Sequence, residues 1–179
     1  MNEGLEELAA RAAAGDQGVL PELLQAIRPL VQRRVAKFLP HHEDAEEATQ
    51  DTLLQVAHKI HTFKGTGSFA GWVTVVATNQ ARQTYRSLKR RSLEQSAEVL
   101  PEAVDPRTTS VIAGSRLDLL EALESLESSH PQLVQPLVLR DLGALSYAEI
   151  ADELDVPLGT VKARIHQARK AVAERLTVH

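Results

Sequence analysis

Apolar residues recur three and four positions apart through most of the chain, a spacing that predicts α-helices rather than strands. One stripe occupies residues 5–12, and a second helix starts near Pro21, which suits a first helical turn, and ends near Pro40. The members of the two stripes are Leu5, Leu8, Ala9 and Ala12, then Leu23, Leu24, Ile27, Leu30, Val31 and Val35. The first forty residues are therefore expected to supply two amphipathic helices.

A third helix is predicted in HHEDAEEATQDTLLQVAHKIHTF, whose acidic start suits the positive end of a helix dipole. Its expected core stripe is Ala45, Ala48, Leu53, Val56 and Ile60, with Thr52 alongside Leu53. This register leaves a polar face toward solvent or a partner. The polar face consists of Glu43, Glu47, Gln50 and Asp51.

The segment FKGTGSFAGW, residues 63–72, is predicted to be a loop because it combines three Gly with two Phe. The helix after it has an inner stripe at Val73, Ala77, Ala81, Thr84 and Leu88, and a neighbouring stripe at Val75, Asn79, Arg82 and Arg86. No carboxylate occurs from Thr52 to Leu93. The Gly-rich loop lets other groups approach its main chain closely, and aromatic rings and cations flank it. This combination favours binding to nucleic acid, including an unpaired strand.

The segment LSYAEIADELDVPLGTVKARIHQARKAVAERL predicts two helices joined by a tight turn. Ser146 and Glu149 have the spacing of a capping box, and a turn over 155–157 precedes the second helix. On that helix Val161, Ile165, Ala168, Val172 and Leu176 form the inner face, while Ala163, His166, Gln167 and Lys170 point away and Lys162 and Arg164 flank them. A basic second helix after a tight turn is typical of a helix-turn-helix that enters the DNA major groove.

Composition predicts an all-α protein. The distribution of charge along the chain predicts two small helical domains. Residues 92–115 hold one Arg against four acids, with two Pro, and are predicted to form a flexible acidic linker between domains at 1–91 and 116–179. The chain has no Cys, which excludes disulfides and thiolate chemistry, and no run of apolar residues long enough to cross a bilayer. These features predict a cytoplasmic protein without a cofactor or metal.

In order and spacing, DAEEATQDTLLQV, the stretch from Phe63 to Arg91 and the helix-turn-helix resemble the bacterial RNA polymerase sigma factors of the extracytoplasmic-function group. The resemblance implies a non-enzymatic initiation factor that binds core polymerase, reads the −35 element as duplex and opens the −10 element. It also implies one copy per holoenzyme, with contacts to the clamp helices of the largest subunit and to the flap. A further candidate partner is an anti-sigma protein, which could hold the chain at the inner membrane face.

Residue roles follow from the same resemblance. It assigns polymerase binding to Asp44, Glu47, Gln50 and Asp51; the −10 element to Lys64, Phe69, Trp72, Asn79, Arg82 and Arg86; and the −35 element to Arg140, Thr160, Lys162, Ala163, Arg164, His166, Gln167 and Lys170. Four positions depart from the family pattern. They are Thr49, Leu53, Pro157 and Gln167.

Two alternatives remain open at this point. A dimeric repressor or activator of the response-regulator type would use a similar second helix, but it needs neither the acidic helix nor the Gly-rich loop. A carboxylate metal site is a second alternative, although adjacent His residues cannot share one helical face. Its ligands would be His41, His42, Glu43, Glu46 and Glu47.

Overall fold

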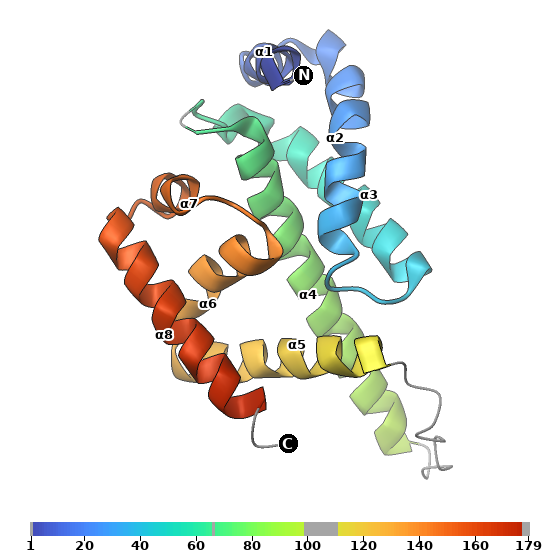
Figure 1. Cartoon of the computed structure of the whole chain (residues 1–179). Helices are drawn as coiled ribbons and strands as arrows, with labels where there is room; N and C mark the ends of the chain where they lie inside the picture. The colour runs from blue at the N-terminus through green and yellow to red at the C-terminus, as the bar shows by residue number, and fades with distance from the viewer. Residues whose placement is uncertain (1, 66, 99–110, 177–179) are drawn as a thin grey trace.

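The computed structural model describes residues 2–65, 67–98 and 111–176, which are helical apart from turns and short connections and contain no strand (Figure 1). The predicted all-α class is confirmed. The N-terminal half contains α1 (Asn2–Ala13), η1 (Gln17–Val19), α2 (Leu20–Val35), α3 (His42–Lys59) and η2 (Ile60–Thr62), followed by α4 (Phe69–Glu98). The C-terminal half contains α5 (Val111–Ser129), α6 (Pro131–Leu137), the π-helical turn η4 (Val138–Leu142), α7 (Tyr147–Leu154) and α8 (Leu158–Leu176).

Helices α2, α3 and α4 pack against one another and form the core of the N-terminal half. The predicted stripe of α2 is buried at Leu23, Ile27, Val31 and Val35, each at most 1% exposed. The helix ends at Val35 rather than near Pro40, because tight turns take over from Ala36 and place Phe38 and Leu39 in the core. Burial of this apolar surface is the main force that holds the three helices together.

The register of α3 differs from the prediction at one point. Thr49 and Thr52 are buried, whereas Leu53 is only half-buried. Each threonine hydroxyl donates a 2.7 Å hydrogen bond to the carbonyl four residues earlier in its own helix, so neither carries an unpaired polar group into the core. This internal hydrogen bonding allows both threonines to be more deeply buried than Leu53, which packs at the edge of the core.

The predicted linker is shorter than 92–115. Helix α4 continues to Glu98 and α5 begins at Val111, so both ends of that segment are helical, and residues 99–110 lie outside the described part of the chain. No Pro or Gly lies between Arg91 and Glu98, and the first Pro is Pro101. A helix without a breaker continues into polar sequence, which a search for apolar stripes misses.

The C-terminal half contains the helix-turn-helix, formed by α7 and α8. Ser146 and Glu149 form the predicted capping box: the Ser146 hydroxyl accepts from the Glu149 amide at 3.2 Å, and the Glu149 carboxylate accepts from the Ser146 amide at 2.8 Å. Asp155 ends α7 in the left-handed conformation, with φ of 51°. The core of this motif contains Leu139, Leu145, Ile150, Val161 and Ile165. The predicted helix-turn-helix is therefore confirmed as a structure. The predicted inner face of α8 is buried only as far as Val172, because Leu176 is the last residue of the helix and is 44% exposed.

The two halves do not lie apart. Helix α4 lies beside the C-terminal half, as Figure 1 shows, and contacts η4 directly. Val75 of α4 packs against the helix-turn-helix core, and the Lys37 ammonium donates a 2.7 Å hydrogen bond to the Leu142 carbonyl. The sequence predicted two domains but gave no indication of this packing.

Candidate functional site

The acidic face of α3 is open to solvent. Glu43, Glu47, Gln50 and Asp51 are exposed and Asp44 is half-buried. The Asp51 carboxylate accepts from the Gln80 amide at 3.3 Å, and Gln80 also accepts from Gln55 at 2.7 Å, so α4 helps to position this end of the face. An open row of carboxylates suits a partner with a basic surface.

Glu46 has a different role from its acidic neighbours. Its carboxylate accepts from the Arg28 guanidinium and, at 3.4 Å, from the Gln32 amide, both on α2. This pairing joins α3 to α2 and leaves Glu46 unsuited to a metal. Among the described residues, no three His, Cys, Asp or Glu side chains converge as metal ligands. The alternative metal site at residues 41–47 therefore has no support in the geometry.

The loop before α4 ends at Ser68 rather than at Trp72, because α4 already begins at Phe69. Two glycines and an aromatic cluster shape it. Gly65 and Gly67 have φ of 70° and 81°, a region that side-chain-bearing residues rarely adopt. The rings of Phe63 and Phe69 lie 5.1 Å apart edge to face, and Phe69 stacks on Trp72 at 5.7 Å. Phe69 is fully buried, while Phe63 and Trp72 are half-buried and Lys64 is exposed. In this conformation Phe69 positions the loop, and Trp72 and Lys64 are the predicted contacts that solvent reaches.

A carboxylate from α1 caps the start of α4. The Phe69 amide donates to both carboxylate oxygens of Glu6, at 2.8 and 3.1 Å, and the Gly71 amide donates to the Ser68 hydroxyl at 3.1 Å. The first amides of a helix have no partner within it, and they carry the positive end of its dipole. No sequence pattern reveals Glu6, because its partner is a main-chain amide 63 positions away.

Replacing Glu6 by alanine is expected to lower the free energy of unfolding by about 1–2 kcal/mol, since it removes a charged partner from a helix N-terminus. Chemical denaturation followed by circular dichroism would measure the change. Glu7→Ala, at an exposed position on the same helix, serves as the control and should stay near the wild-type value. Equal effects of the two substitutions would assign the loss to α1 itself rather than to the cap.

The polar stripe of α4 is occupied by side chains of the C-terminal half. The Gln135 amide donates to the Asn79 side-chain oxygen at 3.0 Å. The Glu127 carboxylate accepts from Arg82 at 2.7 Å and also from Arg86. One turn further along, the Lys89 ammonium donates to Glu124 at 2.6 Å. The structure thus brings Asn79, Arg82 and Arg86 together, as predicted, but pairs them within the chain.

The electrostatics of this stripe reflect burial and pairing. The Arg82 side chain is 12% exposed, and burial lowers the pKa of its guanidinium while the Glu127 carboxylate acts in the opposite direction. The hydrogen bond to Glu124 raises the pKa of Lys89 above its ordinary value. Arg86, at 46% exposed, remains more open to water and salt. Arg82 is therefore the least accessible cation of the stripe.

The outer face of α8 remains accessible. Its exposed side chains are Lys162, Ala163, His166, Gln167 and Lys170, with Thr160 and Arg164 half-buried. Arg140 is held at the edge of the motif, because it donates to the Leu145 carbonyl at 2.7 Å and its guanidinium lies 4.7 Å from the centre of the Tyr147 ring. Arg169 donates to Asp141 at 3.0 Å and joins α8 to η4. The predicted major-groove face is thus presented outward.

The capping box of α7 is expected to depend on pH. Its hydrogen bond from the Ser146 amide holds the pKa of Glu149 below the ordinary value of 4.5. A lowered pKa stabilises the fold above pH 4.5, and this contribution is lost as the pH falls through the folded-state value. Glu149→Gln should therefore cost about 1 kcal/mol at neutral pH, and the difference from wild type should shrink on acidification. Thermal unfolding at neutral pH and at a pH below the folded-state pKa of Glu149 measures this difference, with the exposed Asp152→Asn as control. A difference between wild type and Glu149→Gln that does not change with pH would contradict the prediction.

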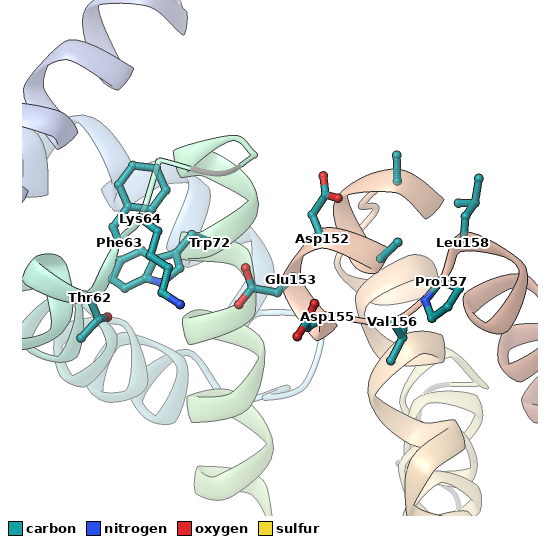
Figure 2. A pocket seen from close by; sticks show the side chains of 12 residues that line it. Thr62, Phe63, Lys64, Trp72, Asp152, Glu153, Asp155, Val156, Pro157 and Leu158 are labelled. Carbon is teal, nitrogen blue, oxygen red and sulfur yellow. The ribbon is translucent and has the colours of Figure 1, made fainter.

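A cleft separates the loop before α4 from the turn between α7 and α8. It encloses about 940 Å³, and Figure 2 shows Phe63, Lys64 and Trp72 on one side with Asp152, Glu153 and Asp155 on the other. At its edge the Ser68 hydroxyl donates to Glu149 at 2.9 Å. Acidic side chains of the C-terminal half therefore face the aromatic rings and the Lys64 ammonium across this cleft.

Within the described ranges, no helix has the length and apolar character of a membrane span.

Two family models match the chain. Sigma-70 region 2 matches residues 23–91, which include the acidic face of α3, the loop and the basic end of α4. Sigma-70 region 4 matches residues 116–172, which include the helix-turn-helix. Helix α1, with Glu6, precedes the matched ranges.

Relatives share most of this length. The ECF RNA polymerase sigma factor SigE of Mycolicibacterium smegmatis is 34% identical over 93% of this chain, which spans 66% of that relative. The ECF RNA polymerase sigma-E factor of Escherichia coli K12 is 28% identical over 98% of this chain and 97% of its own. Among solved structures, CnrH in complex with the cytosolic domain of CnrY has a TM-score of 0.51 at 23% identity and covers 97% of both chains, a likeness of fold.

Proposed function

The chain belongs to the extracytoplasmic-function sigma factors of bacterial RNA polymerase, and we propose from its geometry how it directs promoter-specific transcription initiation. The observation that carries the proposal is the presence of three distinct surfaces on one chain: an acidic face on α3, a Gly-rich aromatic loop with the basic stripe of α4, and the outer face of α8. The acidic face docks on the clamp helices of the largest polymerase subunit through Asp44, Glu47, Gln50 and Asp51.

DNA recognition is divided between the two halves. The outer face of α8 enters the major groove of the −35 element, with Lys162 and Arg164 flanking Ala163, His166 and Gln167. Thr160, Lys170 and Arg140 lie at its edges. In the N-terminal half, Asn79 and Trp72 lie on the stripe that receives an unpaired −10 base, while Lys64, Arg82 and Arg86 hold the strand backbone.

The protein is an initiation factor by family, and we infer that catalysis resides in the polymerase. This function places the chain in the cytoplasm, where polymerase and promoter are. A further partner is proposed because relatives have one: the solved complexes include CnrH with the cytosolic domain of CnrY, and RpoE with the anti-sigma factor NepR from Bartonella quintana. An anti-sigma protein that is itself anchored in the membrane would hold the chain at the inner membrane face.

Run-off transcription with sigma-free bacterial core polymerase tests the function over a pool of promoter fragments. Promoter-selective transcripts should appear only with this protein. They should fall for Glu47→Ala through weaker binding to core, and for Asn79→Ala through weaker open-complex formation with core binding unchanged. Glu22→Ala, at an exposed acid of α2 that belongs to none of the three surfaces, is the matched control.

The response-regulator alternative makes the opposite prediction. A chain of that type would bind a duplex palindrome as a dimer without polymerase, and core would gain no promoter specificity from it. Sedimentation of the free chain with duplex DNA, with and without core, distinguishes the two.

A further inference from the structure

One continuous face of α4 includes four of the side chains that the proposed function uses for an unpaired strand, namely Trp72, Asn79, Arg82 and Arg86. Its positions are separated alternately by four and three residues, so they follow one side of the helix. The members are Ser68, which caps the helix, then Trp72, Val75, Asn79, Arg82, Arg86 and Lys89. We refer to these residues as the strand face.

The C-terminal half contacts the strand face along its length. Glu149 accepts from Ser68 at one end, and Glu124 accepts from Lys89 at the other. Between them, Val75 packs against the helix-turn-helix core. Gln135 and Glu127 occupy the positions next to it, on Asn79 and the two arginines.

The groups that occupy the face resemble a nucleic-acid strand in their chemistry. The Glu127 carboxylate is an anion shared by two guanidinium groups, which is how a backbone phosphate would be held. The Gln135 amide donates to the Asn79 side-chain oxygen. An Asn side chain can form the same type of hydrogen bond with the edge of a base, so Gln135 takes the place that a base would occupy. Arg82, at 12% exposed, cannot reach a phosphate while Glu127 remains in place.

We propose that the C-terminal half covers the strand face as an internal competitor, so that this half and an unpaired DNA strand bind α4 in mutually exclusive arrangements. The inference rests on the proposed function, because it assigns the face to a DNA strand. The acidic face of α3 and the outer face of α8 stay accessible in the closed arrangement. A closed chain can therefore meet polymerase and duplex DNA, whereas capture of the −10 strand requires opening.

The contacts indicate how opening is controlled. Arg86 and Glu127 are 46% and 35% exposed, so salt reaches this pair and weakens it. A ligand that binds only the open form has its affinity lowered by the open fraction. Neutralising Glu127 should raise that fraction and, with it, the affinity for a single strand.

Energy transfer between dyes on the two halves measures the closed form without any promoter. The chain has no Cys, so His58→Cys on α3 and Arg175→Cys on α8, both exposed and outside the proposed DNA-binding residues, give two labelling sites in an otherwise thiol-free background. Glu127→Gln should lower the transfer, and added salt should lower it in the parent but less in this variant. Asp118→Asn removes the same charge from an exposed position of α5 and should leave the transfer unchanged.

Binding of a short fluorescent single-stranded DNA of mixed sequence supplies the second readout. Glu127→Gln should tighten it by about tenfold while Asp118→Asn does not, and excess strand should lower the transfer in the parent. Transfer that ignores both Glu127→Gln and salt overturns the proposal, as does an opened variant without tighter strand binding. The response of the transfer to Glu127→Gln and to salt does not depend on transcription, so failure of the proposed function would appear in the run-off assay and leave that response unchanged.

Discussion

Replacing Phe69 by alanine is expected to lower the free energy of unfolding by about 3–5 kcal/mol. Its ring is fully buried, stacks on Trp72 and meets Phe63 edge to face. Truncation leaves a cavity beneath the loop, where the Glu6 cap also holds the Phe69 amide and limits how far the backbone can collapse. Urea unfolding of the purified chain measures the loss.

Phe69→Leu separates packing from DNA contact. Leucine retains much of the buried volume, so its cost should be clearly smaller than that of alanine. If Phe69 acts only by positioning the loop, Phe69→Leu keeps open-complex formation close to the parent at a temperature where both fold. A folded Phe69→Leu protein that no longer opens promoters would instead assign the ring a direct contact with the strand.

Local signals were sufficient for the helix-turn-helix. A capping box needs only Ser146 and Glu149 three residues apart, and the inner face of α8 repeats at helical spacing from Val161 to Val172. Both patterns lie within one or two helices, so tertiary packing has little scope to alter them. The outward face of α8 followed directly from that register.

The helical spacing of polar residues was insufficient to predict the partner of the α4 stripe, because two kinds of partner can satisfy the same hydrogen-bond donors. Asn79, Arg82 and Arg86 were correctly placed on one stripe, but a stripe of hydrogen-bond donors accepts either phosphates or carboxylates. The acids that meet it, Glu124 and Glu127, lie on α5, beyond residues 99–110. Which surface meets which depends on the tertiary arrangement, and helical spacing carries no information about it.

Burial of small or polar side chains is the other part that the sequence concealed. Thr52 is more deeply buried than the neighbouring Leu53 because its hydroxyl bonds within its own helix, and Glu6 caps a helix remote in sequence. Both cases depend on hydrogen bonds to main-chain atoms, and every residue supplies such atoms regardless of its type.

Arg164→Ala is expected to weaken binding of the holoenzyme to a −35 duplex about 5-fold to 150-fold, and to relax the base preference at one position. Arg164 is half-buried on α8 and its planar guanidinium suits a guanine edge, whereas Lys162 is exposed and its ammonium suits a phosphate. Lys162→Ala should therefore weaken all sequences alike and reduce the slope of log affinity against log salt by about 1. Competition assays over a library of −35 sequences at several salt concentrations distinguish the two effects, with the exposed Arg175→Ala in the last turn of α8 as the control.

Arg164→Lys keeps the positive charge and loses the planar guanidinium, so it should relax base preference without changing the salt slope. A uniform loss for Arg164→Ala would make that residue a phosphate contact and move base reading to His166 and Gln167.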